Sequence, residues 1–142
     1  MPVSMELREN GRVVFIVLSD PWNTGDLRSL LRQISDYLRD IYPQAHMLVD
    51  LTRAKVIPTD ALQQIFEDLR AFKPDSGEVI LVGATRAMQL LGELVFRLFH
   101  LGSIRFLDTQ EAAWALLKEF IAGEDSLIIP SQEPDSSSRE GT

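Results

Sequence analysis

Short apolar runs of strand length alternate with helical segments along most of this chain, and this alternation is the feature that most constrains its fold. The runs expected as buried strands are 46–51, 78–82 and 104–107. Apolar residues at helical spacing mark four further segments: 27–41, 62–72, 86–101 and 108–121. Neighbouring parallel strands need crossovers of this length, which are usually helices and almost always right-handed. The pattern therefore predicts a mostly parallel sheet with helices on at least one face.

The N-terminal region predicts an antiparallel hairpin. Asn10 and Gly11 lie between the strand-like runs 3–8 and 12–18, and this dipeptide favours the positive φ angles of a tight hairpin turn. The predicted order is β-β-α-β-α-β-α-β-α. We expect a single α/β domain with one mixed sheet of about five strands and about four helices.

The ends of two helices carry recognisable capping residues. Asn23 or Thr24 is expected to cap the first helix, with Asp26 in its first turn. The last helix opens with a capping-box pattern, Asp108 followed three residues later by Glu111.

Composition divides the chain into a folded domain and a tail. Of the 142 residues, 45% are hydrophobic, which suits one globular domain over 1–122. Residues 123–142 hold five acids and one Arg, a charge of −4, and their Ser/Pro-rich composition predicts disorder. The domain itself has 13 basic and 16 acidic residues, a charge of −3. It shows no basic stripe, which argues against nucleic-acid binding.

The sequence favours a cytoplasmic protein without a membrane span. Cysteine is absent, and no charged and apolar N-terminal segment resembles a secretion signal. The apolar segment 86–101 carries Glu93, Arg97 and His100 and is shorter than the roughly 20 residues that cross a bilayer.

Motifs for catalysis, metal or cofactor binding are not evident, so we expect no enzyme activity and no cofactor. His46 and His100 lack metal-ligand spacing and are expected to be structural. At Gly83, Thr85 and Arg86 a strand passes into a helix start, which could hold an anion. The alternative is that Gly83 turns the chain and Thr85 caps the helix.

The segment 86–101 is more apolar than one buried helix face requires. Its hydrophobic residues cover roughly two-thirds of the helix circumference. Gly92 in the middle costs roughly 0.8–1 kcal/mol relative to Ala, which suggests close approach of a neighbour. We predict an interaction surface here, formed by Met88, Leu91, Gly92, Val95, Phe96 and Phe99. Full burial within the same chain and a lipid-like ligand remain the alternatives.

The order of these motifs resembles the STAS-like family of anti-sigma-factor antagonists, nearest to its SpoIIAA-like branch. The resemblance covers residues 3–122 and rests on 48–52, 79–83, 104–109 and the Ala-rich run 111–116. It implies a bacterial, non-enzymatic regulatory module that binds a protein partner. The same branch is related in shape to the lipid-carrying CRAL-TRIO domains.

The resemblance also points to a loop that carries a phosphoacceptor Ser in partner-switching members of the family. The matching positions here are Pro58, Thr59, Asp60 and Ala61. Thr59 keeps a hydroxyl, but Asp60 already places a negative charge beside it, which disfavours a phosphate. The alternative is that Thr59 or Asp60 caps a helix. Asp50, after the preceding apolar strand, is the only carboxylate that could pair with Asp60.

From these observations we predict a regulatory module that docks through the helix at 86–101, either as a homodimer or on another protein. The alternative function is a carrier of a small apolar, lipid-like ligand.

Overall fold

The computed structural model describes residues 3–56, 77–98 and 100–132. The chain divides into two compact units, Met1–Gln110 and Glu111–Thr142. The first unit contains the whole sheet and two of the described helices.

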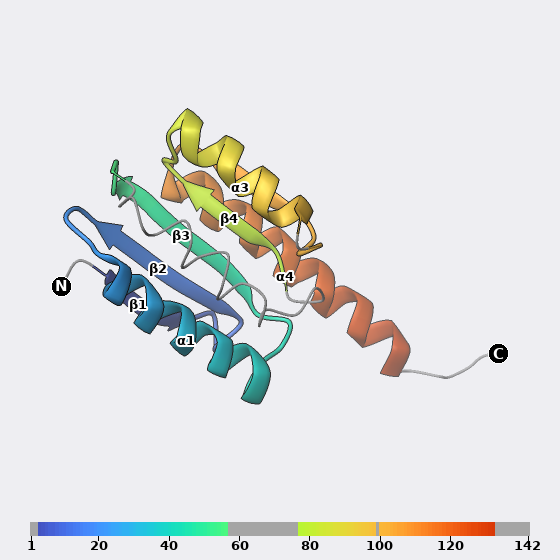
Figure 1. Ribbon diagram of the computed structural model, residues 1–142. Helices are drawn as coiled ribbons and strands as arrows, with labels where there is room; N and C mark the ends of the chain where they lie inside the picture. Colours follow the sequence, from blue (N-terminus) through green and yellow to red (C-terminus); the bar gives the residue numbers. More distant parts are fainter. Residues whose placement is uncertain (1–2, 57–76, 99, 133–142) are drawn as a thin grey trace. The chain divides into compact units, whose positions relative to one another are not determined.

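The sheet of the first unit has five strands, whose order in space equals their order in the sequence. Figure 1 labels β1 to β4, which lie side by side. Strand β1 pairs antiparallel with β2, whereas β2, β3, β4 and β5 are parallel to one another. This confirms the predicted mixed sheet with its N-terminal hairpin. The strands are β1 (Val3–Arg8), β2 (Val13–Ser19), β3 (His46–Arg53), β4 (Val79–Val82) and β5 (Ile104–Leu107).

The hairpin between β1 and β2 has a longer turn than a two-residue loop. Glu9, Asn10 and Gly11 all have positive φ, at 53°, 59° and 82°. The amide of Gly11 donates to the carbonyl of Arg8, and that of Arg12 donates to Glu9. Asn and Gly tolerate this left-handed conformation best, which explains why the turn forms here.

Helix α1 (Thr24–Asp40) begins with the capping box that the sequence predicts. The Asn23 side chain accepts from the Asp26 amide at 2.9 Å, and the Asp26 carboxylate accepts from the Asn23 amide at 3.0 Å. Its six buried side chains recur at helical spacing and face the sheet: Leu27, Leu30, Leu31, Ile34, Tyr37 and Leu38.

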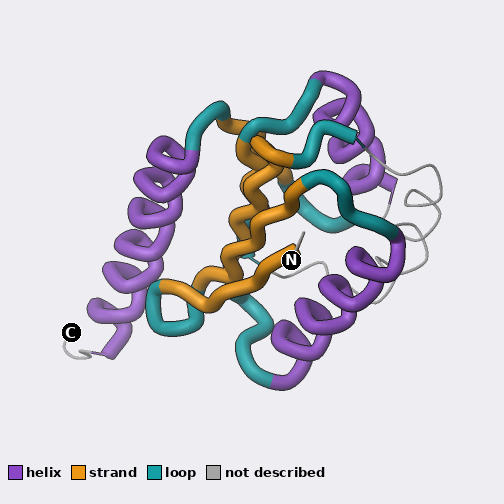
Figure 2. Tube along the Cα trace, turned by 90° about the vertical axis from the view of Figure 1, so that its left-hand side faces the viewer, coloured by secondary structure: helices purple, strands orange, loops and turns teal. Residues whose placement is uncertain are grey.

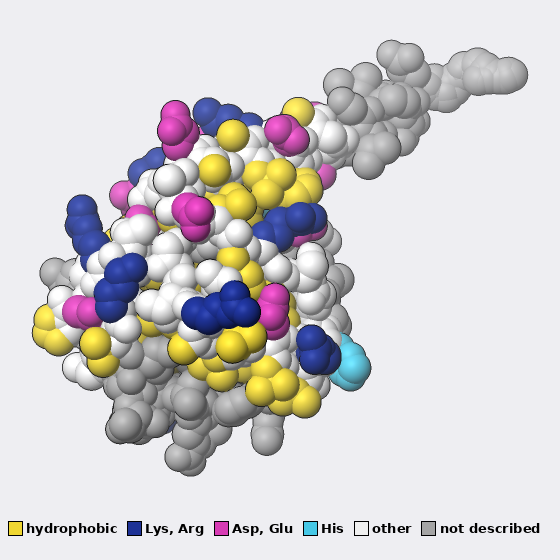
Figure 3. Space-filling view, turned by 90° about the horizontal axis from the view of Figure 1, so that it is seen from above, with side chains coloured by type: hydrophobic (Ala, Val, Ile, Leu, Met, Phe, Trp, Pro, Cys, Tyr) yellow, Lys and Arg dark blue, Asp and Glu magenta, His cyan; other side chains and the backbone are white. Residues whose placement is uncertain are grey.

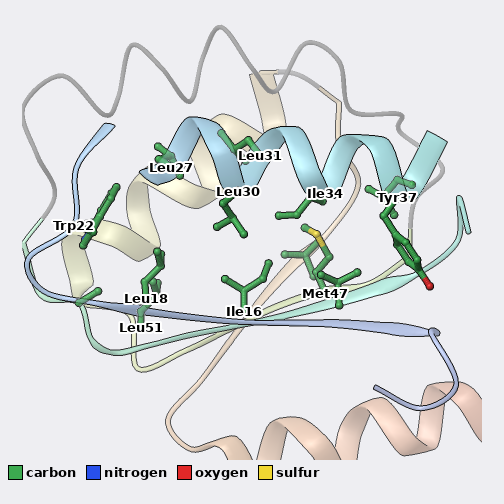
Figure 4. Close-up of a cluster of buried hydrophobic side chains, with 14 of the residues drawn as sticks. Ile16, Leu18, Trp22, Leu27, Leu30, Leu31, Ile34, Tyr37, Met47 and Leu51 are labelled. Carbon is green, nitrogen blue, oxygen red and sulfur yellow. The ribbon is translucent and has the colours of Figure 1, made fainter. Parts of the chain in front are cut away.

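Helices α1 and α3 (Arg86–Leu98) lie on the same face of the sheet (Figures 1 and 2). The core of the first unit is between α1 and the strands, where Ile16 and Met47 from the sheet meet Leu30 and Ile34 from the helix (Figure 4). Burying side chains of this kind stabilises the fold by about 1.5–3 kcal/mol each.

The second unit consists of α4 (Gln110–Gln132) from Glu111 onward. The helix begins within the predicted capping-box segment. It continues past residue 122, where the sequence predicts the start of a disordered tail, and reaches Gln132. Residues 133–142 lie outside the described residues.

The described part of the chain contains three helices, compared with the four or so that we predict. The remaining predicted helix, at 62–72, lies outside the described residues. None of the helices in the described ranges combines the length and apolar character needed to cross a membrane.

Candidate functional site

The solvent-facing side of α3 carries three leucines in one row. Leu90, Leu94 and Leu98 are 57%, 45% and 57% exposed. They follow one another at intervals of four residues, which places them on one side of the helix, each about 6 Å further along its axis. We call these three residues the leucine row. Exposed leucines at this spacing form a contiguous apolar strip.

The opposite side of α3 packs within its own unit. Met88 and Val95 are buried, and Leu91, Gly92 and Phe96 are partly buried. Five of the six residues that we predict as an interaction surface therefore face the interior wholly or partly, whereas Phe99 lies outside the described residues. The helix has more apolar residues than its buried side uses. Its large apolar side chains that are exposed to solvent are those of the leucine row.

The absence of a side chain at Gly92 allows α3 to pack closely against the sheet. A Cβ atom at this position would lie 3.3 Å from Ile104 Cδ1 and 3.3 Å from Phe106 Cζ, both on β5. The neighbour that approaches Gly92 is thus a strand of the same chain.

Opposite charges flank the leucine row on one side. Glu93 and Arg97 are exposed, and by helical geometry both lie next to the row. Among the described residues neither of them forms an ion pair. Figure 3 shows a face of the molecule on which hydrophobic side chains reach the surface between charged ones. The surface of α3 is therefore both apolar and charged.

An apolar cavity of about 220 Å³ lies between α1, α3 and the sheet. The described residues that line it include Leu30 and Ile34 of α1, Val49 of β3, and Leu91 and Phe96 of α3. Its described lining is almost entirely hydrophobic, without a His, Asp, Glu, Lys or Arg side chain. The described lining suits an apolar group.

Asp50 on β3 is buried, at 7% exposure, and is held by three donors. Its carboxylate accepts from the Thr52 amide at 2.8 Å, from the Thr52 hydroxyl at 2.7 Å, and from the side-chain amide of Gln110. Burial raises the pKa of Asp50, but these hydrogen bonds and the charge of Arg53 outweigh it, so the pKa is lowered. Asp50 is therefore a charged anchor between β3 and Gln110, the last residue of the first unit.

Gly83 turns the chain from β4 toward α3, as expected. Its φ is +73°, and an added Cβ would lie 2.5 Å from Thr52 Cγ2. The hydroxyl of Thr85 accepts from the Met88 amide at 3.3 Å, so it caps the helix. Arg86 is exposed at the first position of α3. The capping interpretation is confirmed, and the anion site at Gly83, Thr85 and Arg86 stays a prediction.

The two histidines occupy very different places. His46 is buried, and its Nδ1 accepts from the Glu78 amide at 2.9 Å. This bond ties the start of β3 to the residue before β4. His100 is exposed and has a φ of +53° just after α3, where the chain leaves the helix. The described residues contain no cluster of His, Cys, Asp and Glu suited to a metal ion.

The predicted phosphoacceptor region, Thr59 and Asp60, lies outside the described residues. The pairing of Asp50 with Asp60 lies outside them too. Among the described residues, Asp50 contacts Thr52 and Gln110, partners that its position after an apolar run does not reveal.

Comparison with solved structures gives a clear match to "Structure of the Bacillus Cell Fate Determinant SpoIIAA in the Phosphorylated Form". The TM-score is 0.59 at 17% sequence identity, over 81% of this chain and 98% of that chain. The fold is similar to that of SpoIIAA. The SpoIIAA-like fold agrees with the resemblance found in the sequence. No protein-family model and no curated protein sequence matches the chain.

Proposed function

We propose that this protein is a non-enzymatic regulatory module of the STAS-like type, which docks on a protein partner through the leucine row of α3. The observation that carries the proposal is the exposure of Leu90, Leu94 and Leu98 on a helix whose other side is already packed. Three exposed leucines on one strip are a cost in water unless a partner covers them. The SpoIIAA-like fold supports a regulatory role, because SpoIIAA itself is described as a cell fate determinant.

The distribution of charged and polar groups supports docking over catalysis. The buried Asp50 is fully engaged by Thr52 and Gln110, and the buried His46 accepts a backbone amide. His46 ties the start of β3 to the residue before β4, and Asp50 ties β3 to Gln110. A catalytic acid or base needs a free position beside a substrate, and these two residues do not offer one.

The test uses a partner captured by the full chain and then purified. Calorimetry would measure its affinity for the wild type, for Leu94→Lys, and for Ile41→Lys as a control. Ile41 is 70% exposed at the end of α1 and lies outside the leucine row. We expect Leu94→Lys to weaken binding at least about tenfold and Ile41→Lys to leave it unchanged. Equal affinity for all three proteins would refute docking through this row.

A second candidate function is favoured by the cavity between α1, α3 and the sheet. We propose it as the alternative: a carrier or sensor of a small apolar ligand. A cavity of about 220 Å³ exceeds the roughly 150 Å³ that accommodates benzene but is smaller than typical pockets for drug-sized ligands, about 300–1,000 Å³. It suits one ring or a short chain better than a lipid tail.

The carrier function can be tested independently of docking. Native mass spectrometry of gently purified full chain would reveal a bound apolar molecule. Val49→Phe adds a ring inside the cavity and should displace it, whereas Leu94→Lys on the outer side of α3 should not. A protein that carries no added mass and takes up no small aromatic probe argues against this alternative.

A further inference from the structure

We propose that the leucine row pairs with the same row of a second copy of this chain, with the two α3 helices antiparallel about a twofold axis at Leu94. This inference rests on the proposed docking function and specifies a second copy of the chain as the molecule that covers the leucine row. A twofold interface requires a surface that is complementary to itself. Both the leucines and the charges of α3 meet this requirement.

The spacing of the leucines is symmetric. Leu90 and Leu98 each lie four residues, about 6 Å along the axis, from Leu94. An antiparallel partner centred on Leu94 therefore brings Leu90 against the partner's Leu98, and Leu98 against the partner's Leu90. Every leucine of the row becomes covered by another leucine.

The charges select the antiparallel direction. With the axis at Leu94, Glu93 lies about 1.5 Å to one side and Arg97 about 4.5 Å to the other. The partner's Arg97 then falls within about 3 Å of Glu93 along the axis, and the same contact forms a second time by symmetry. A parallel pair about a twofold axis would instead place the charged sides of the two helices at opposite edges of the interface, so that Glu93 would not face the partner's Arg97. Only the antiparallel arrangement provides opposite charges to two residues that have no ion pair among the described residues.

The size of the surface sets the strength of the pair. Helix α3 has 13 residues, whereas stable complexes use about 20–30 residues on each side. The pair is therefore transient, and it forms at micromolar to millimolar concentrations of the chain.

Sedimentation equilibrium of the full chain, from about 10 μM to 1 mM, tests the pairing. The wild type should pass from monomer to dimer with increasing concentration. Leu94→Lys puts two like charges at the axis and should raise the dimer dissociation constant at least about tenfold. Ile41→Lys, with the same change of charge outside the row, should dimerise like the wild type. A wild type that stays monomeric up to 1 mM would overturn the inference.

Charge exchange gives a second test that does not depend on the leucines. Glu93→Arg alone places four arginines along one side of the interface and should weaken the dimer. Glu93→Arg combined with Arg97→Glu restores opposite charges in both copies and should restore the dimer. Failure of the double variant to recover, while its thermal unfolding matches the wild type, counts against antiparallel pairing.

The outcomes separate this inference from the proposed function. A monomeric wild type, whose purified protein partner is still lost in Leu94→Lys, removes the self-pairing and keeps the docking function. A dimer that Leu94→Lys disrupts, with partner binding unaffected, supports the self-pairing and removes docking on another protein through this row.

Discussion

Replacing Asp50 with Ala tests whether its carboxylate anchors the first unit. The substitution removes the acceptor for the Thr52 amide, the Thr52 hydroxyl and the Gln110 side chain. Leaving buried donors without an acceptor costs about 1–3 kcal/mol each. Because the Thr52 hydroxyl and the flexible Gln110 side chain can turn toward other acceptors, we expect a total loss of about 2–4 kcal/mol in the free energy of unfolding.

The loss is large enough to measure by thermal unfolding. For a chain of 142 residues, it corresponds to a fall in Tm of roughly 7–13 °C at pH 7. Asp36→Ala is the matched control, because Asp36 is an exposed carboxylate on α1 that pairs with Arg39 at 2.8 Å. Exposed pairs contribute little, so the control should change Tm only slightly.

The direction of the Asp50 pKa shift determines how its contribution to the free energy of unfolding changes with pH. The pKa of Asp50 is lowered in the folded protein, so its charge stabilises the fold fully above its ordinary value of 3.8. This contribution decreases as the pH falls from that value toward the lowered pKa. The difference in stability between the wild type and Asp50→Ala should therefore shrink below about pH 4. A variant as stable as Asp36→Ala at pH 7, or a difference that does not shrink in acid, would refute the reasoning.

Three other substitutions test the packing around the site. Gly83→Ala should lower the free energy of unfolding in urea by at least about 2 kcal/mol, because φ is +73° and the new Cβ would meet Thr52; no change would contradict this. Gly92→Leu should lower it by about 1–3 kcal/mol through overpacking against β5, whereas Gly92→Ala should stay within about 1 kcal/mol of the wild type; equal effects of the two would be evidence against close packing. Tyr37→Phe removes the hydroxyl that donates to the Gly11 carbonyl and should cost about 1 kcal/mol in the same assay; a fully stable variant would show that this bond contributes nothing.

The strands were predictable because their signals are local. The runs 46–51, 78–82 and 104–107 correspond to β3, β4 and β5 with ends that differ by a residue or two. The Asn10-Gly11 turn, the Asn23 cap and the Thr85 cap also follow from neighbouring residues. In each case a few adjacent side chains determine the backbone conformation.

The site was harder to predict because it depends on contacts that are distant in sequence. The apolar composition of 86–101 indicates an interaction surface, but which leucines face water depends on how α3 rotates against β5. Gly92 sets that rotation by allowing Ile104 and Phe106 to approach. Similarly, Asp50 meets Gln110 across 60 residues of sequence. The sequence predicts a last helix over 108–121, whereas α4 continues to Gln132. Composition alone does not show how far a helix propagates.

The spatial order of the strands has a consequence for how the protein is made. Since β1 to β5 lie side by side in the order of synthesis, each new strand finds its neighbour already in place at the growing edge. No strand has to wait for a later one to be inserted beside it, so the first unit can assemble stepwise while translation proceeds. Interruption of synthesis after β4 would leave a continuous four-stranded sheet that ends at β4, with no gap in its centre, and a shortened chain of this kind should keep the hairpin and the α1 core together.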